Sequence, residues 1–105
     1  MNIAQHEIAG WKFRGKLEDF EENSPGDEFD LVPEPENPYD PCAVRLEFDG
    51  RHTGYVPRPL NEALIVLGVQ NFQAEFVEIG PKGPILVYSF DSQGVIDEIK
   101  KNQAS

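Results

Sequence analysis

The sequence predicts an all-β fold with minor α content: a small OB-like or SH3-like β-barrel of about six strands, with one short inserted helix and a C-terminal helix. Short runs of alternating apolar and polar residues recur along the chain, and turn residues separate them. Asp49-Gly50 is the strongest hairpin signal, because glycine accepts the positive φ that a tight turn demands. A chain of 105 residues is long enough for one core, so we expect one domain.

The first half of the chain is predicted to supply four strands. These are residues 6–15, 28–33, 42–50 and 51–57. Gly10 is expected to break the first strand, and Pro33 closes the second. In the third, Val44, Leu46 and Phe48 alternate with polar residues, which predicts that these three side chains point inward.

The second half is predicted to hold two helices and two strands. In chain order these are a helix near residues 59–67, strands at residues 71–80 and 84–91, and a helix at residues 92–102. Pro59 is placed at the start of the first helix and Gly68 at its end. Lys100 and Lys101 lie in the last turn of the second, where basic side chains interact favourably with the helix dipole.

The formal net charge of −10 is concentrated in one part of the sequence. Residues 18–40 hold ten acidic residues and no lysine or arginine, while the remaining nine acids are balanced by nine basic residues. We interpret residues 17–30 as a solvated, partly mobile acidic loop. The alternative is an acidic surface that repels or imitates nucleic acid.

Several classes of site are not expected. The single Cys42 excludes an internal disulfide, and neither His6 nor His52 has a second ligand at metal-binding spacing. No apolar run is long enough to span a membrane and no signal peptide is recognisable, so a cytoplasmic protein without a membrane partner is predicted. No paired groups indicate nucleophilic or acid-base catalysis. We therefore expect no enzyme activity and no cofactor.

Residues 34–64, EPENPYDPCAVRLEFDGRHTGYVPRPLNEAL, resemble the HIRAN domain in the Asn-Pro-Tyr-Asp turn, the two following strands and the helix. The resemblance extends from about residue 8 to residue 90 and is to free-standing bacterial or phage members. It implies a single HIRAN-like domain over residues 1–105 with a core at about 8–90. The long acidic loop and the C-terminal helix lie outside the family pattern.

The resemblance further implies an OB-like barrel that binds the 3′ end of single-stranded DNA. By the matching motif, Asn37 would organise the turn and contact the nucleic acid, Tyr39 would stack on a base, and Asp40 would bind the terminal 3′-hydroxyl. Trp11 and Lys12 stand where the family has an aromatic residue and an arginine, so Trp11 would stack on a base and Lys12 would contact a phosphate. The remaining candidates are Arg14 and Arg58 for phosphates and Tyr55 as a further contact residue.

The residue types allow other interpretations. Asn and Asp beside proline often only form a turn, and a tyrosine there often covers the core. The second functional candidate is a protein-interaction module on the same barrel that has lost DNA binding and uses its acidic surface. Basic residues gathered around Tyr39 would favour DNA, and acids around it would favour the protein partner. The sequence does not specify an oligomeric state.

Overall fold

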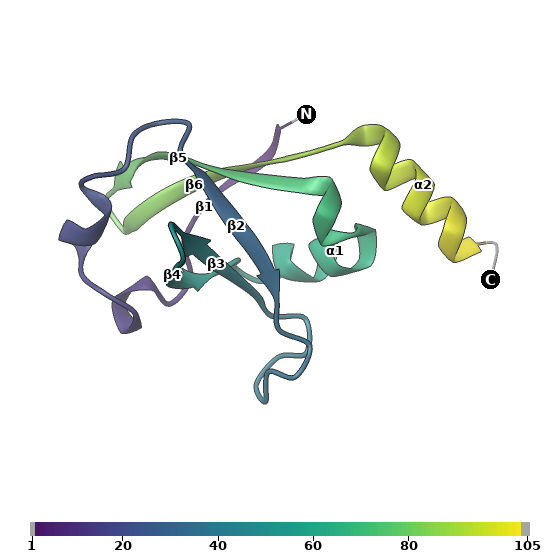
Figure 1. Cartoon of the computed structure of the whole chain (residues 1–105), viewed down its shortest axis with the longest axis horizontal. Helices are drawn as coiled ribbons and strands as arrows, with labels where there is room; N and C mark the ends of the chain where they lie inside the picture. Colours follow the sequence, from purple (N-terminus) through teal and green to yellow (C-terminus); the bar gives the residue numbers. More distant parts are fainter. Residues whose placement is uncertain (1, 104–105) are drawn as a thin grey trace.

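The six strands form one antiparallel sheet in the computed structural model, which describes residues 2–103 (Figure 1). The strands are β1 (Asn2–Glu7), β2 (Glu28–Pro33), β3 (Val44–Phe48), β4 (Arg51–Tyr55), β5 (Phe72–Gly80) and β6 (Gly83–Phe90), in the sheet order β1-β6-β5-β2-β3-β4. The predicted all-β fold with two helices is confirmed. The ends of the predicted domain, residues 1 and 104–105, lie outside the described residues.

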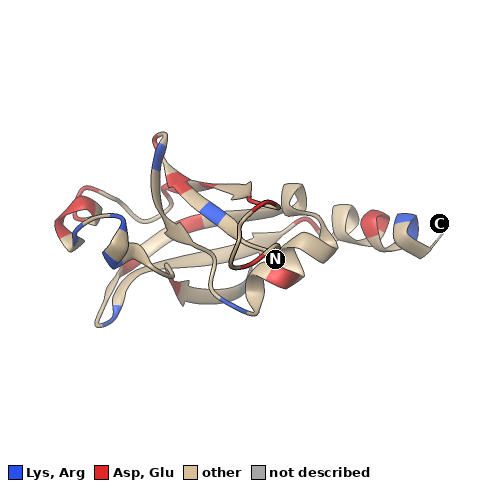
Figure 2. Cartoon of the chain, turned by 90° about the horizontal axis from the view of Figure 1, so that it is seen from below, with Lys and Arg blue, Asp and Glu red and all other residues tan. Residues whose placement is uncertain are grey.

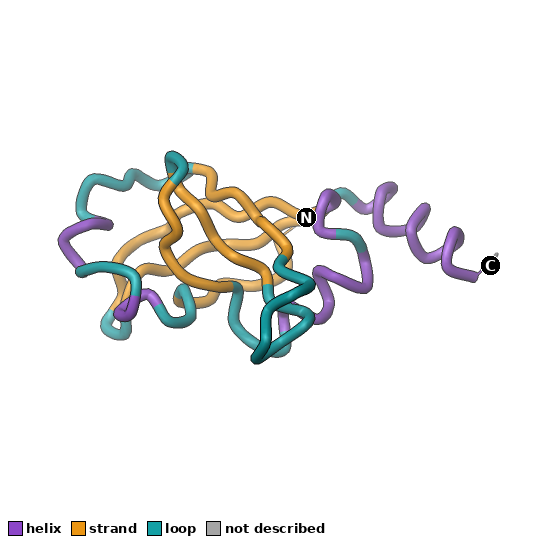
Figure 3. Tube along the Cα trace, turned by 60° about the horizontal axis from the view of Figure 1, so that its bottom comes forward, coloured by secondary structure: helices purple, strands orange, loops and turns teal. Residues whose placement is uncertain are grey.

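The sheet curls so that its two outer strands approach each other (Figure 3). Just after β1, Ala9 forms an isolated bridge with Tyr55 at the end of β4: each backbone N–H donates to the other carbonyl over 2.9 Å. Gly54 permits this approach, because its φ is +153° and a Cβ there would collide with the Ile8 side chain and the Ala9 carbonyl. The closure brings the segment after β1 beside β4.

The core lies inside the curled sheet and follows the period-two pattern of the strands. Val44 and Leu46 are fully buried as predicted, and Leu86 and Tyr88 of β6 are buried in the same way. Burial of each such side chain stabilises the fold by roughly 1.5–3 kcal/mol. Phe48 is only half-buried, with its ring centroid 5.0 Å from that of Phe29 on β2.

Both predicted helices are confirmed, with bounds close to those expected. Helix α1 (Leu60–Leu67) packs Leu64 into the core and ends at Gly68, whose φ is +92°. Helix α2 (Ser92–Gln103) projects from the end of the sheet, and Val95 is its buried residue (Figure 1). Within residues 2–103 no helix is long and apolar enough to cross a membrane.

The first strand was predicted wrongly. Strand β1 ends at Glu7, and Trp11–Phe13 forms a 3₁₀ turn instead of continuing the strand. Gly10 has a φ of +69°, which turns the chain so that the Phe13 N–H donates to the Gly10 carbonyl over 3.1 Å. A break at Gly10 was expected, but the chain does not resume as a strand after it.

Parts of the predicted acidic loop, residues 17–30, form regular secondary structure. Its start forms a 3₁₀ turn (Leu17–Phe20), and residues 28–30 belong to β2. Phe20 is 2% exposed and packs edge-on against Trp11, with ring centroids 6.1 Å apart. Burial of this phenylalanine fixes the acidic segment to the barrel.

The bridge at Gly54 yields a stability prediction. We expect Gly54→Ala to lower the free energy of unfolding by about 1–3 kcal/mol more than Gly26→Ala does, since an added Cβ at residue 54 is overpacked. Gly26 is the matched control: its φ is +95°, so alanine is strained there too, but no atom lies within 4 Å of the added carbon. Urea unfolding of both variants measures the difference, and equal losses would contradict the role given to Gly54.

Candidate nucleic-acid interface

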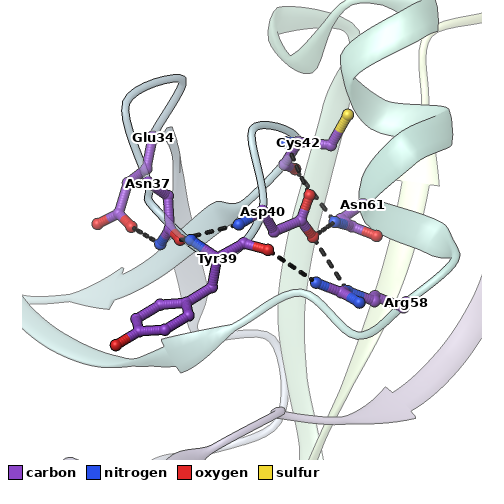
Figure 4. A network of polar contacts seen from close by, with 7 residues as sticks. All are labelled: Glu34, Asn37, Tyr39, Asp40, Cys42, Arg58 and Asn61. Atoms are coloured by element: carbon purple, nitrogen blue, oxygen red, sulfur yellow. Dashed lines mark hydrogen bonds and ion pairs between the residues drawn. The ribbon is translucent and has the colours of Figure 1, made fainter.

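The connection between β2 and β3, residues 34–43, is a turn organised by Asn37 (Figure 4). The Asn37 Oδ1 atom accepts hydrogen bonds from the backbone N–H groups of Tyr39 (2.9 Å) and Asp40 (3.1 Å). Asparagine is suited to this position because its side chain imitates a backbone acceptor. These two hydrogen bonds hold the turn, which is the organising role predicted for Asn37.

Asp40 connects this turn to the start of α1. Its Oδ1 accepts from the Cys42 N–H (2.9 Å), while its Oδ2 accepts from Arg58 Nε (3.1 Å) and Asn61 Nδ2 (2.9 Å). Asn61 is 1% exposed, and its Nδ2 also donates to the Cys42 carbonyl over 3.1 Å. The Cys42 N–H first, then Asn61 and Arg58, hold the pKa of Asp40 below its ordinary value, so the carboxylate is ionised at neutral pH.

Glu34 ties the same turn to β3 and β4. Its Oε1 accepts from Asn37 Nδ2 (3.0 Å) and from the Tyr55 hydroxyl (2.9 Å), and its Oε2 accepts from Arg45 (3.0 Å). The pKa of Glu34 is lowered, mainly by the hydrogen bond from Asn37 and further by the hydrogen bond from Tyr55 and the charge of Arg45. Burial acts in the opposite direction. Burial and the Glu34 carboxylate raise the pKa of Tyr55.

A hollow of about 940 Å³ opens between the turn, β4 and the start of α1. Six of the eight predicted site residues line it: Arg14, Asn37, Tyr39, Asp40, Tyr55 and Arg58. Glu34, Glu36 and Asn61 also contribute to its wall. The structure thus brings most of the predicted site together on one concave surface.

Trp11 and Lys12 do not line the hollow. Trp11 packs on Phe20, and its Nε1 donates to the Lys82 carbonyl over 3.3 Å. The Lys12 Nζ lies 5.7 Å from the centre of the Trp11 ring. The exposed aromatic side chain of this segment is Phe13, which is 91% exposed and was not predicted as a contact residue.

The charges around Tyr39 are mixed rather than basic. Arg14 and Arg58 line the hollow together with the acids Glu34, Glu36 and Asp40. Lys12, Arg14 and Lys16 follow one another along the chain, but the other basic residues are spread over the fold, and acidic residues lie among them (Figure 2). The exposed Arg14 has its guanidinium 6.0 Å from the Tyr55 ring centre, and the Arg58 side chain is 67% exposed while it is paired with Asp40. Either basic or acidic residues were expected around Tyr39 from the sequence, and the structure places both kinds there.

Two residues of the network were missed from the sequence, Glu34 and Asn61. A signal existed for Asn61: it lies three positions before Leu64 on the apolar face of α1, where a polar residue needs a specific partner. Glu34 has one nearby partner, Asn37, but its other partners Arg45 and Tyr55 are 11 and 21 residues away and have no local signal.

The fold and the site define a class of protein: a small OB-like barrel with a concave binding surface beside the β2–β3 turn. A model of the HIRAN domain matches residues 3–82, and the chain therefore belongs to the HIRAN domain family. Among solved structures, the HIRAN domain of human HLTF is similar, with a TM-score of 0.62 and 17% sequence identity over 93% of this chain and 86% of that one. At this identity the likeness concerns the fold. No curated protein matches the chain.

The contacts of Glu34 predict an acid-sensitive site. A carboxylate with a lowered pKa stabilises the fold above its unfolded pKa, near 4.5 for glutamate, and this stability is lost as pH falls through the folded value. We expect Glu34→Gln to be less stable than the wild type at neutral pH and to lose less stability on acidification to about pH 3.

The exposed neighbour Glu36 provides the control for this test. Glu36→Gln should follow the wild-type curve, because residue 36 is exposed and only residue 34 holds the hydrogen bonds described above. Urea unfolding at several pH values compares the three proteins. A Glu34→Gln variant whose stability falls as steeply with acid as the wild type would show that Glu34 is not the group responsible.

Proposed function

We propose that this HIRAN domain is a non-catalytic module that binds the 3′ end of single-stranded DNA in the hollow beside the β2–β3 turn. Membership of the HIRAN family supports a nucleic-acid-binding module. The observation that carries the finer proposal is the pairing of an ionised carboxylate, Asp40, with a neighbouring aromatic side chain, Tyr39, that is 90% exposed.

The hydrogen-bonding capacity of Asp40 favours a strand end. A carboxylate accepts about four hydrogen bonds, two at each oxygen. Oδ2 already has two donors, Arg58 and Asn61, and Oδ1 has one, the Cys42 N–H. One position at Oδ1 is left for the hydroxyl of a 3′ terminus. A phosphate at the same place would bring like charge and no proton to donate.

The remaining groups fit a short contact with an unpaired strand. Tyr39 and the exposed Phe13 offer rings on which bases can stack, whatever the sequence. Arg14 and Arg58 are positioned for phosphates at the hollow, and the exposed Lys12 lies next to Phe13 outside it. Because Glu34 and Glu36 repel a long polyanion, binding through a terminus with few phosphates is more favourable than binding along a continuous strand.

The acids that line the hollow also support a second candidate function, binding of a protein partner. Three acids line the hollow beside two arginines, and a protein segment that offers hydrogen-bond donors would meet less repulsion there than DNA. In that case oligonucleotides with any kind of end would fail to bind.

The test of end recognition is a fluorescence-anisotropy titration with single-stranded oligonucleotides that carry a 3′-hydroxyl, a 3′-deoxy end or a 3′-phosphate. We expect loss of the hydroxyl to weaken binding by about 10- to 100-fold, as for a hydrogen bond to a charged group, and the phosphate to weaken it at least as much. Equal affinities for hydroxyl and phosphate ends would rule out recognition through Asp40.

Asp40→Asn tests the carboxylate while keeping the shape of the side chain. It should reduce the difference between hydroxyl and phosphate ends, since the repulsion of phosphate is lost. Because Asp40 also holds the turn, the near-ultraviolet circular dichroism and the unfolding midpoint of the variant need to be measured beside the affinity. Absence of binding to all three ends by the folded wild type would favour the protein partner.

Stacking is tested separately at Tyr39. Tyr39→Ala should weaken all three oligonucleotides equally, by about 5- to 100-fold, because the ring stacks on a base and does not contact the end group. Tyr39→Phe is the matched control and should bind nearly as well as the wild type. Phe13→Ala should resemble Tyr39→Ala, and Trp11→Phe should leave affinity unchanged if Trp11 only packs against Phe20. A larger loss for Tyr39→Phe than for Phe13→Ala would contradict stacking at residue 39.

A further inference from the structure

A second hollow lies where β2 and β5 separate. These neighbouring strands share only two residue pairs, Glu28 with Glu75 and Phe29 with Ala74, and then diverge (Figure 1). The hollow that opens beyond the last pair has a volume of about 370 Å³. Its lining comes from β2, from the start of β5 and from the 3₁₀ turn before it (Val69–Asn71).

Toward this hollow, β2 directs a backbone N–H and C=O, those of Leu31, that are not paired with β5. On the β3 side, the backbone N–H of Glu34 donates to the Ala43 carbonyl. Successive residues of a strand direct their N–H and C=O groups to opposite sides. The backbone groups of Leu31, three residues earlier, therefore point toward β5. Leu31 and Phe72 would form the next pair of the β2–β5 ladder, which ends before them. Phe72 instead donates its N–H to the Val69 carbonyl. Leu31 therefore presents a strand edge inside a concave site.

The lining of this hollow is acidic. Glu28 and Asp30 are exposed, lie on the same face of β2 two residues apart, and no lysine, arginine or histidine is among the described residues of the lining. At the closed end, Glu28 is directly opposite Glu75, and like charges across a strand pair repel. None of these three carboxylates forms an ion pair with a described residue. A cation placed here would relieve the repulsion.

We infer that the gap between β2 and β5 binds an extended, lysine- or arginine-bearing segment of a partner protein by strand addition to Leu31. Backbone hydrogen bonds to the edge of β2 supply the register. Basic side chains at alternate positions of the segment then lie on the face that carries Glu28 and Asp30, because both strands have a period of two residues. A nucleic acid is excluded as the occupant by the charge of the lining.

Nuclear magnetic resonance tests this inference with a defined probe, the blocked peptide acetyl-Lys-Val-Lys-Val-Lys-amide. We expect amide shifts on titration at Leu31, Phe72 and Gln73, with a dissociation constant on the order of a millimolar, because a short flexible peptide is ordered on binding. The Glu-Val-Glu-Val-Glu analogue should cause no shifts. A Lys-Val-Lys-Val-Lys peptide that is N-methylated at its valines should bind several-fold more weakly, since it cannot form the strand hydrogen bonds.

Asp30→Lys and Glu22→Lys make the charge test specific. Both change the net charge equally at exposed positions, but only residue 30 lines the hollow. Asp30→Lys should abolish the shifts, whereas Glu22→Lys should preserve them, and neither should change oligonucleotide binding. The inference is overturned if the peptide causes no shifts at several millimolar, if the N-methylated peptide binds equally well, or if the two variants behave alike.

Discussion

The carboxylate of Asp40 is the constraint on which the geometry of the site depends. Three parts of the chain donate to it: its own turn through the Cys42 N–H, the segment after β4 through Arg58, and α1 through the buried Asn61. An asparagine at residue 40 could not accept all three bonds, because its side chain has a single acceptor oxygen. The ionised state of one residue thus fixes the turn against α1 and gives the hollow a defined wall, while Tyr39 is held beside it with its ring in solvent (Figure 4).

Glu34 has the same function at the other end of the turn, and the two carboxylates together determine the chemistry of the hollow. Glu34 is held by Asn37, Tyr55 and Arg45, so the arginine on β3 is committed to an internal acid. The two arginines that line the hollow face three acids there, and Arg58 is itself paired with Asp40, so the hollow is poor in free positive charge. On the proposed function, affinity for a strand end there would come from ring stacking and directed hydrogen bonds more than from counterion release, which depends on the number of phosphates neutralised.

The sequence predicted the parts of this fold that local pattern determines. The hairpin at Asp49-Gly50 and helix α1 follow from turn chemistry and periodicity, and Asn37 forms its turn with its nearest neighbours. The prediction for the segment at Trp11 was wrong. It assumed the two-residue period of a strand, which would place Trp11 and Phe13 on the same face of the sheet. The 3₁₀ turn after Gly10 instead buries part of Trp11 against Phe20 and leaves Phe13 exposed. The position of Asn61 on the apolar face of α1 signals that it needs a partner, but no local pattern identifies that partner as Asp40, 21 residues away.

The way the sheet closes explains why a site of this kind forms at this end of the barrel. From Asp30 to Pro33, β2 is paired with β3 alone, so the turn that follows it belongs to a β2-β3-β4 unit. Arg14, which also lines the hollow, is not part of that unit because it lies in the segment after β1. The bridge between Ala9 and Tyr55 brings in the segment after β1, and Arg14, five residues beyond Ala9, reaches the Tyr55 ring as a result. Closure of the barrel is therefore also the step that completes the hollow, since it joins a cation from the first segment to the turn and to the start of α1.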